Sequence, residues 1–162
     1  MMEKLGRTCV VALCVCLCTF ASAPVRAAGD RERIQQIVDD LRARLAIPQT
    51  VTVAVVPTNS QLFSVAPVEH EHGTFLLSVE EDFARALNEA ELTAAVAHEL
   101  GHVWIYTHFP YLQTEELAND VAARVIDRTT LGPLYDKVWK KAGADLEPQA
   151  IHQQTRELRP LP

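Results

Sequence analysis

Two histidines lie four residues apart in this chain, at His98 and His102, and Glu99 directly follows the first. The stretch before them is mainly apolar and predicts a helix that continues to about residue 106. Asn88 can cap that helix, and Glu91, three residues later, completes a capping box. One stable helix is therefore expected to carry both histidines and the glutamate between them.

The spacing of these residues predicts a metal site. Four residues correspond to about 400° of helical turn, so the two imidazoles project from one face and can bind a single Zn²⁺. Glu99 lies about 100° around the helix from His98, beside the metal and not on it. From there it can take a proton from a zinc-activated water, which makes Glu99 the candidate catalytic base.

A catalytic zinc takes three protein ligands and keeps one position open. His108 stands six residues after His102, which is the metzincin spacing. That class needs a glycine where this chain has Ile105, and a methionine-containing turn, whereas both methionines here lie at the first two positions. His108 is therefore the least favoured of three candidates for the third ligand.

The other two candidates are Glu115 and Glu116, at the start of a helix predicted over residues 114–127. Glu115 lies at the edge of the apolar stripe, roughly 70° from its centre, and Glu116 lies nearly opposite. Because a ligand must face the neighbouring helix, Glu115 is favoured and Glu116 remains the alternative. Asn119, one turn after Glu115, and the adjacent Asp120 are candidates for groups that hydrogen-bond a metal-binding histidine. The apolar stripe consists of Leu117, Ala118, Val121, Ala122, Val125 and Ile126.

The rest of the chain predicts an α+β fold, with a small β-sheet packed on the active-site helix and on the third-ligand helix. Residues 58–71 are expected to be irregular, and the segment 73–79 is expected to form the edge strand on which an extended peptide adds as a further strand. The expected strands are 50–56 and 73–79, and the further helices are 30–45, 80–87 and 134–142.

The first 27 residues have the layout of a cleavable secretory signal peptide. Two basic residues precede an uncharged apolar run that is too short for a comfortable membrane span, and small residues follow. One domain over 28–145 and a flexible tail over 146–162 are expected to follow. The predicted location is therefore periplasmic or secreted, with no membrane span in the mature chain.

The positions of the cysteines and the net charge limit which metal ligands and which partners are expected. All four cysteines lie within the predicted leader, so the mature chain must hold a metal with histidine and carboxylate groups. The net charge of −6 and the lack of a basic patch argue against nucleic acid as a partner. A peptide or protein substrate is the expected partner of a zinc site of this kind.

The segment 50–102 resembles the HtpX/CaaX-prenyl-protease-like family of gluzincin metallopeptidases, through its valine-rich strand, the strand at 73–79 and the motif of His98 and His102. The family's downstream pattern is a ligand glutamate, two residues, alanine and aspartate. Here it is Glu115-Glu-Leu-Ala-Asn119, a version similar to the ImmA/IrrE-type peptidases. The resemblance implies a zincin-like core, with zinc bound by both histidines and Glu115. The family's membrane helices are missing, and the connection from His102 to Glu115 is shorter.

These observations predict an exported zinc metallopeptidase, with a catalytically silent zincin-like binding or regulatory module as the alternative. The sequence fixes no group that would stabilise the oxyanion, and the candidates are Tyr106, Tyr111, Arg124 and His152. A pair of histidines in a polar loop, at positions 70 and 72, could add a weak second metal site, although a plain surface loop is favoured.

Overall fold

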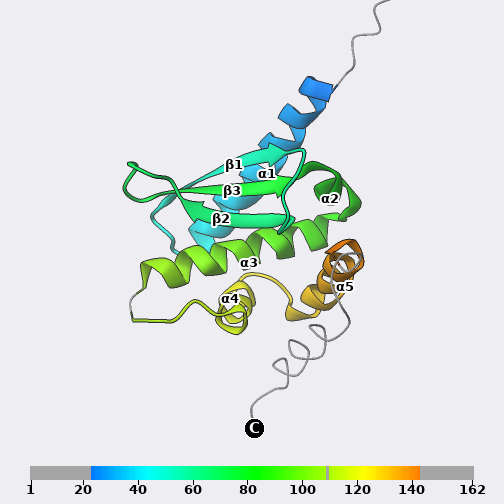
Figure 1. Cartoon of the computed structure of the whole chain (residues 1–162). Helices are drawn as coiled ribbons and strands as arrows, with labels where there is room; N and C mark the ends of the chain where they lie inside the picture. Colours follow the sequence, from blue (N-terminus) through cyan, green and yellow to red (C-terminus); the bar gives the residue numbers. More distant parts are fainter. Residues whose placement is uncertain (1–22, 109, 143–162) are drawn as a thin grey trace, which may run out of the picture.

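The computed structural model describes residues 23–108 and 110–142, and the predicted α+β class is confirmed (Figure 1). The predicted tail and most of the predicted leader lie outside these residues. The elements in chain order are α1 (Ala23–Arg44), β1 (Thr50–Val56), β2 (Phe63–Pro67), β3 (Thr74–Glu80), α2 (Glu81–Ala86), α3 (Glu89–Thr107), α4 (Glu115–Ala122), the 3₁₀-helix η1 (Arg128–Thr130) and α5 (Leu131–Ala142). Helix α1 thus begins before the expected residue 30, in an alanine-rich stretch that favours helix.

The sheet has three strands in the order β1-β3-β2, with β1 parallel and β2 antiparallel to β3. Two expectations about it are wrong. Phe63–Pro67, expected to be irregular, forms the edge strand β2, and β3, expected at the edge, lies in the centre. Strand β2 is short and ends in Pro67, which has no N–H to donate and therefore fits an edge strand. Its short alternation was too weak a pattern to predict a strand.

The register of β2 turns one set of its backbone groups away from β3. The N–H of Glu80 donates to the carbonyl of Leu62 (2.8 Å), and the N–H of Val68 donates to the carbonyl of Thr74 (2.9 Å). Backbone groups that face the partner strand alternate along an antiparallel ladder, so those of Phe63 and Val65 point away from β3. On this outer edge the Phe63 N–H donates to the Gln61 carbonyl (2.7 Å). The edge lies beside α3, which packs against β2 (Figure 1).

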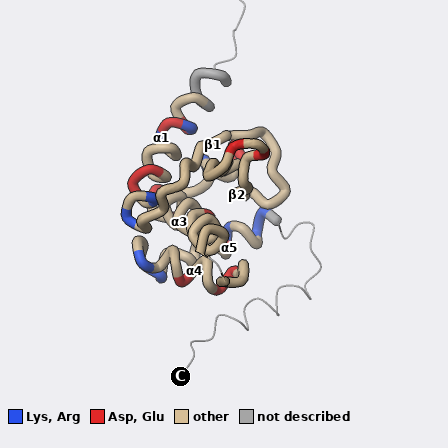
Figure 2. Tube along the Cα trace, turned by 90° about the vertical axis from the view of Figure 1, so that its left-hand side faces the viewer, with Lys and Arg blue, Asp and Glu red and all other residues tan. Residues whose placement is uncertain are grey.

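A single core lies between the sheet and the helices α1 and α3. Helix α1 packs on both β1 and α3, and it carries acidic and basic residues along its length (Figure 2). No helix within the described residues is long and apolar enough to cross a membrane. The largest of the fully buried side chains are Ile34, Val38 and Leu41 of α1, Val51 of β1, Leu77 and Val79 of β3, Phe83 of α2, and Leu92, Val96, Leu100, Val103 and Ile105 of α3.

The N-terminus of α3 is fixed by the capping box that the sequence predicts. The Glu91 N–H donates to the Asn88 side chain (3.0 Å), and the Asn88 N–H donates to the Glu91 carboxylate (2.8 Å). These two bonds satisfy two donors that a helix start otherwise leaves open. The register of α3, and with it the direction of both histidines, is therefore set at its first turn.

The C-terminal helices differ from the predicted ones. Helix α4 ends at Ala122 instead of continuing to 127, because the chain turns there and Asp127 caps η1 instead. Helix α5 begins at Leu131, before the expected residue 134, since Pro133 is tolerated in a first helical turn. Two lysines of α5 join it to the body of the protein: Lys137 pairs with Glu91 (2.5 Å) and Lys141 with Glu80 (2.6 Å).

Candidate metal centre

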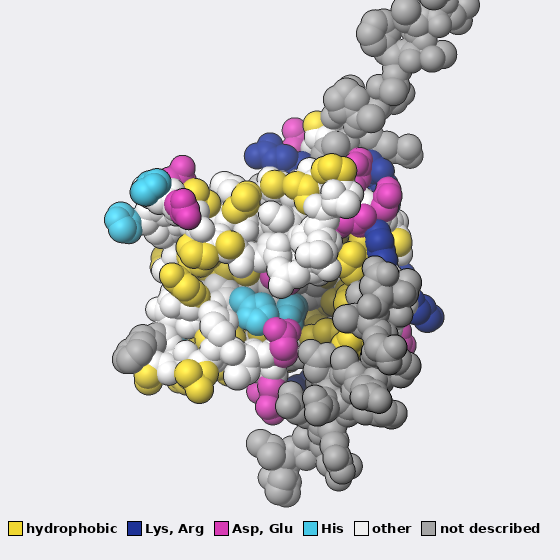
Figure 3. Space-filling view, in the orientation of Figure 1, with side chains coloured by type: hydrophobic (Ala, Val, Ile, Leu, Met, Phe, Trp, Pro, Cys, Tyr) yellow, Lys and Arg dark blue, Asp and Glu magenta, His cyan; other side chains and the backbone are white. Residues whose placement is uncertain are grey.

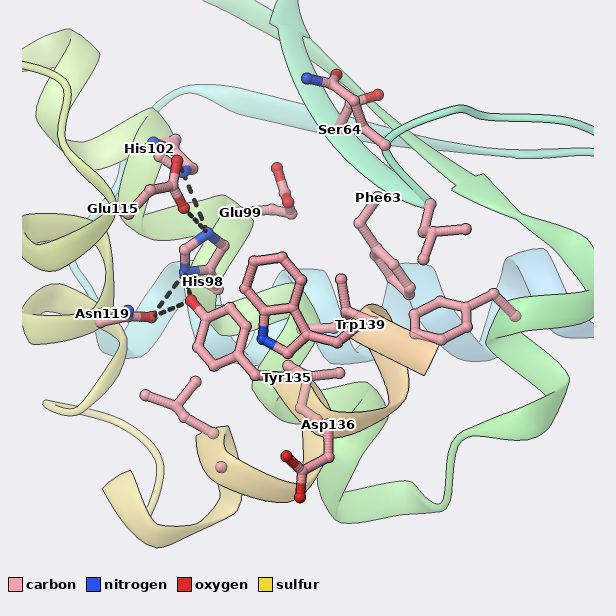
Figure 4. Close-up of a pocket in the computed structure, with 18 of the residues that line it drawn as sticks. Phe63, Ser64, His98, Glu99, His102, Glu115, Asn119, Tyr135, Asp136 and Trp139 are labelled. Atoms are coloured by element: carbon pink, nitrogen blue, oxygen red, sulfur yellow. Dashed lines mark hydrogen bonds and ion pairs between the residues drawn. The ribbon is translucent and has the colours of Figure 1, made fainter. Parts of the chain in front are cut away.

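The side chains of His98, His102 and Glu115 meet between α3 and α4 (Figure 4). The Nε2 atom of His98 lies 3.1 Å from one carboxylate oxygen of Glu115, and that of His102 lies 3.5 Å from the other. The two Nε2 atoms are 3.2 Å apart. The side chain of His98 is 12% exposed, that of His102 22% and that of Glu115 59%. The group is thus anchored in the protein on one side and open to solvent on the other (Figure 3).

These spacings fit one metal ion. Ligand atoms about 2.0–2.1 Å from a metal in tetrahedral arrangement stand about 3.3–3.4 Å from one another. The two imidazole nitrogens are 3.2 Å apart, and each lies 3.1 or 3.5 Å from a different oxygen of Glu115, which is near that value. One ligand atom from each of the three residues lies within 4.8 Å of the other two. Two imidazole nitrogens and a carboxylate oxygen also form a donor set that divalent transition metals favour. The residues present could therefore hold a metal ion at this point.

The ring of His98 is held from behind by Asn119 and Tyr135. Its Nδ1 lies 2.8 Å from Oδ1 of Asn119, and the Tyr135 hydroxyl donates to the same oxygen (2.9 Å). Asn119 is buried, so its oxygen depends on these protein partners. Since the amide oxygen accepts from Nδ1–H, Nε2 of His98 keeps its lone pair for the metal position. Tyr135 was not anticipated from the sequence, because α5 is far from the motif along the chain.

The third member of the triad of His98, His102 and Glu115 is a carboxylate, and it carries the negative charge of that triad. Hydrogen bonds with His102 and His98 lower its pKa far below the usual range, against the opposing effect of burial. For His102, burial favours the neutral ring, but the bonds with Glu115 and Gln113 raise its pKa overall. The ionised carboxylate therefore stabilises a cation at this point, whether a proton or a metal ion.

Glu99 lies on the same helix but outside the triad, and Figure 4 shows its carboxylate directed toward the space beside the two histidines. It is only 9% exposed. Burial raises the pKa of Glu99, and the charge of Glu115 adds to this, whereas both histidines and the backbone N–H of Val65 favour its ionised form. A carboxylate with a raised pKa can both accept and return a proton near neutral pH. Glu99 thus faces the Val65 N–H on the outer edge of β2.

A pocket of about 700 Å³ opens beside the triad. Strand β2 forms one wall, α3 the floor, and α5 with η1 the other wall (Figure 4). Its apolar lining is rich in large side chains, and Figure 3 shows hydrophobic surface next to the histidine pair. These side chains are Phe63, Phe83, Leu131, Leu134, Tyr135, Val138 and Trp139.

Other candidates from the sequence lie elsewhere. Glu116 lines the pocket but is not part of the triad. Asp120, predicted to support a histidine, is exposed and pairs instead with Arg128 (2.8 Å), because it lies on the outer face of α4. The ring of His108 stacks on Trp104, 4.0 Å between centroids, so it is turned away from the other two histidines.

None of the described oxyanion candidates lines the pocket. Tyr106 packs on Phe75 and is 60% exposed, Tyr111 is 56% exposed, and Arg124 lies over the ring of Trp104. His152 lies outside the described residues. The histidines at 70 and 72 belong to the loop between β2 and β3, and no metal-binding cluster includes them within the described residues.

No protein-family model matches the chain, and no curated protein matches it. Among solved structures, the chain is similar to the metallopeptidase zymogen of Pyrococcus abyssi abylysin, with a TM-score of 0.48 and 18% sequence identity. That similarity covers 67% of this chain and 93% of the other. It assigns no role to any residue of this chain.

Proposed function

We propose that the protein is an exported zinc-dependent metallopeptidase. The observation that carries this proposal is the position of Glu99, a buried carboxylate with a raised pKa, beside two imidazole nitrogens and a carboxylate that are close enough together to hold one metal ion. Zinc is the proposed metal because two histidines, one carboxylate and one open position form a common catalytic zinc site. His98, His102 and Glu115 would hold it, with Asn119 supporting His98.

When bound, zinc supplies a Lewis acid that polarises the scissile carbonyl and makes water acidic enough to attack near neutral pH. Glu99 accepts a proton from the attacking water on its carboxylate. It then returns that proton to the amine that leaves as the C–N bond breaks. Burial suits Glu99 to this exchange, because it favours the protonated carboxyl that must form between the two steps.

The edge of β2 supports a peptide as the substrate. The backbone groups of Phe63 and Val65 point away from β3, toward the side on which α3 lies. The Phe63 N–H donates to the Gln61 carbonyl (2.7 Å) and the Val65 N–H faces Glu99, so the two carbonyls are the groups that remain to accept from a peptide. An extended peptide can add to such an edge by main-chain hydrogen bonds. The adjoining apolar pocket would then take a large apolar side chain of that peptide. The sequence predicts the segment 73–79 as the edge strand that binds the peptide, but in the structure β2 lies at that edge.

The test is the substitution Glu99→Gln, with metal content and peptide cleavage measured on the same preparations. We expect the variant to bind zinc like wild type and to lose cleavage by several orders of magnitude. Equal cleavage by wild type and variant would exclude Glu99 as the base. Zinc binding by wild type without cleavage of any member of a peptide library would favour the silent binding module instead.

Export rests on the leader over residues 1–27. The expected mature N-terminus follows Ala27 or Ala28. N-terminal sequencing of the protein recovered from outside the cytoplasm tests this, and an intact Met1 there would contradict it.

A further inference from the structure

Gln113 makes two hydrogen bonds to a single residue of the metal centre, His102. Its Oε1 lies 3.1 Å from Nδ1 of the His102 ring, and its Nε2 donates to the His102 backbone carbonyl, also at 3.1 Å. Gln113 belongs to the connection between α3 and α4, two residues before Glu115. The connection is therefore tied back onto α3 at the residue that lies opposite Glu115 in the triad.

The two bonds fix which way the amide of Gln113 faces. A backbone carbonyl can only accept, so the NH₂ group must face the His102 carbonyl. The amide oxygen is then left facing the ring, and it can only accept as well. The ring nitrogen opposite it, Nδ1 of His102, must therefore carry the proton when the ring is neutral.

The position of that proton decides whether the other ring nitrogen, Nε2, has a lone pair available for a metal. In the metal-free site the Glu115 carboxylate, 3.5 Å from Nε2 of His102, favours a proton on that atom, and the Gln113 oxygen opposes this by favouring the proton on Nδ1. With the proton on Nδ1, Nε2 presents a lone pair toward His98 and Glu115, 3.2 and 3.5 Å away. With the proton on Nε2, the same atom could not bind a metal. The amide oxygen of Asn119 lies 2.8 Å from Nδ1 of His98 and favours the proton on that nitrogen in the same way. Each histidine of the triad thus has its own amide oxygen behind it.

We propose that Gln113 is a positioning residue that selects the metal-binding tautomer of His102 before any metal arrives. The inference rests on the proposed metal site, but not on peptide cleavage. Outer groups that orient metal ligands typically contribute about 10–100-fold to metal affinity. Since Gln113 is neutral and exposed, the lower end of that range is expected.

The test compares wild type with Gln113→Leu, which keeps a similar size but has no acceptor, and with Gln113→Glu, which keeps the acceptor. Long-range ¹H–¹⁵N NMR spectra of the metal-free protein, at a pH where the rings are neutral, report the tautomer of His102. Competition with a chelator reports zinc affinity. In wild type and Gln113→Glu we expect the proton on Nδ1. In Gln113→Leu we expect a mixture of tautomers and about tenfold weaker zinc binding.

Gln36→Leu, at an exposed position on α1, is the matched control and should behave like wild type. The inference is overturned if Gln113→Leu keeps the wild-type tautomer, even with weaker zinc binding, because Gln113 would then only hold the connection in place. The inference is also overturned if the His102 ring of Gln113→Glu no longer carries its proton on Nδ1. Neither the NMR spectra nor the chelator competition depends on peptide cleavage. A protein that shows the tautomer change but cleaves no peptide would refute the proposed peptidase function and leave this inference standing.

Discussion

Gly101 of α3 lies directly against the backbone of Ala118 in α4. A Cβ atom on Gly101 would be 2.5 Å from the carbonyl oxygen of Ala118 and 2.9 Å from its Cα. Ala118 is itself fully buried and has the smallest side chain that is not hydrogen. This close approach of the two helices brings Glu115, one turn before Ala118, within reach of His98 and His102.

The first prediction is that Gly101→Ala pushes α4 away from α3. An alanine in a helix is intrinsically favoured over glycine by about 1 kcal/mol. Here that gain is outweighed, because overpacking against backbone typically costs about 1–3 kcal/mol. We expect a lower melting temperature and weaker zinc binding, measured by thermal denaturation and chelator competition. Gly132→Ala is the control, since a Cβ there meets nothing within 4 Å, and it should be neutral or slightly stabilising.

The second prediction separates the two adjacent glutamates of α4. Glu115→Ala should abolish stoichiometric zinc binding, because it removes the carboxylate whose oxygens lie 3.1 and 3.5 Å from the two imidazoles. Glu116→Ala removes an equal charge from the next position, which lies outside the triad, and should retain the metal. Metal analysis of the two purified variants decides between them. Loss of zinc from the Glu116 variant alone would reverse the assignment.

The parts of the site that lie on one helix could be predicted from sequence. Helical periodicity relates His98 to His102 regardless of what surrounds them, and the capping box of Asn88 and Glu91 is a local pattern. Helix phase also favoured Glu115 over Glu116, since only one face of α4 can meet α3. These inferences need the geometry of a single helix and no knowledge of how elements pack.

What could not be predicted depends on contacts between segments distant in sequence. Tyr135 reaches His98 from α5, and Val65 reaches Glu99 from β2. Gln113 lies in a connection with no periodicity, so nothing local indicates that its amide turns back to His102. The order of strands is likewise a tertiary property, because β2 gains its place only by pairing with β3.

The third prediction concerns the attachment of α5 at low pH. The hydrogen bond from Lys137, together with the Asn88 N–H, lowers the pKa of Glu91 against the effect of burial. A pKa lowered by folding gives stability that is present above the unfolded pKa, near 4.5, and lost as the pH falls through the folded pKa. The free energy of unfolding should therefore decrease on acidification below about pH 4.5.

Lys137→Met removes the partner of Glu91 and should flatten this acid dependence while lowering stability at neutral pH. Urea denaturation at a series of pH values measures both effects. Lys140→Met, at an exposed position on the same helix, should follow the wild-type curve. An acid dependence that is equally steep in the Lys137 variant would show that Glu91 gains nothing from that lysine.

The fourth prediction concerns the pocket wall formed by α5. Trp139 is a large apolar side chain in the lining, beside Tyr135 and opposite Phe63 (Figure 4). In a peptidase that seats a large apolar residue there, Trp139→Ala removes contact area worth about 1–3 kcal/mol of discrimination. The value of kcat/KM should fall roughly 10-fold or more for peptides with a large apolar side chain, and much less for peptides with a small one. Leu112→Ala, at a position 78% exposed and outside the pocket, is the control. Zinc affinity should not change in either variant, because neither residue belongs to the group of His98, His102 and Glu115. A uniform loss of kcat/KM across all peptides would instead show that Trp139 supports the fold of the wall and not the choice of substrate.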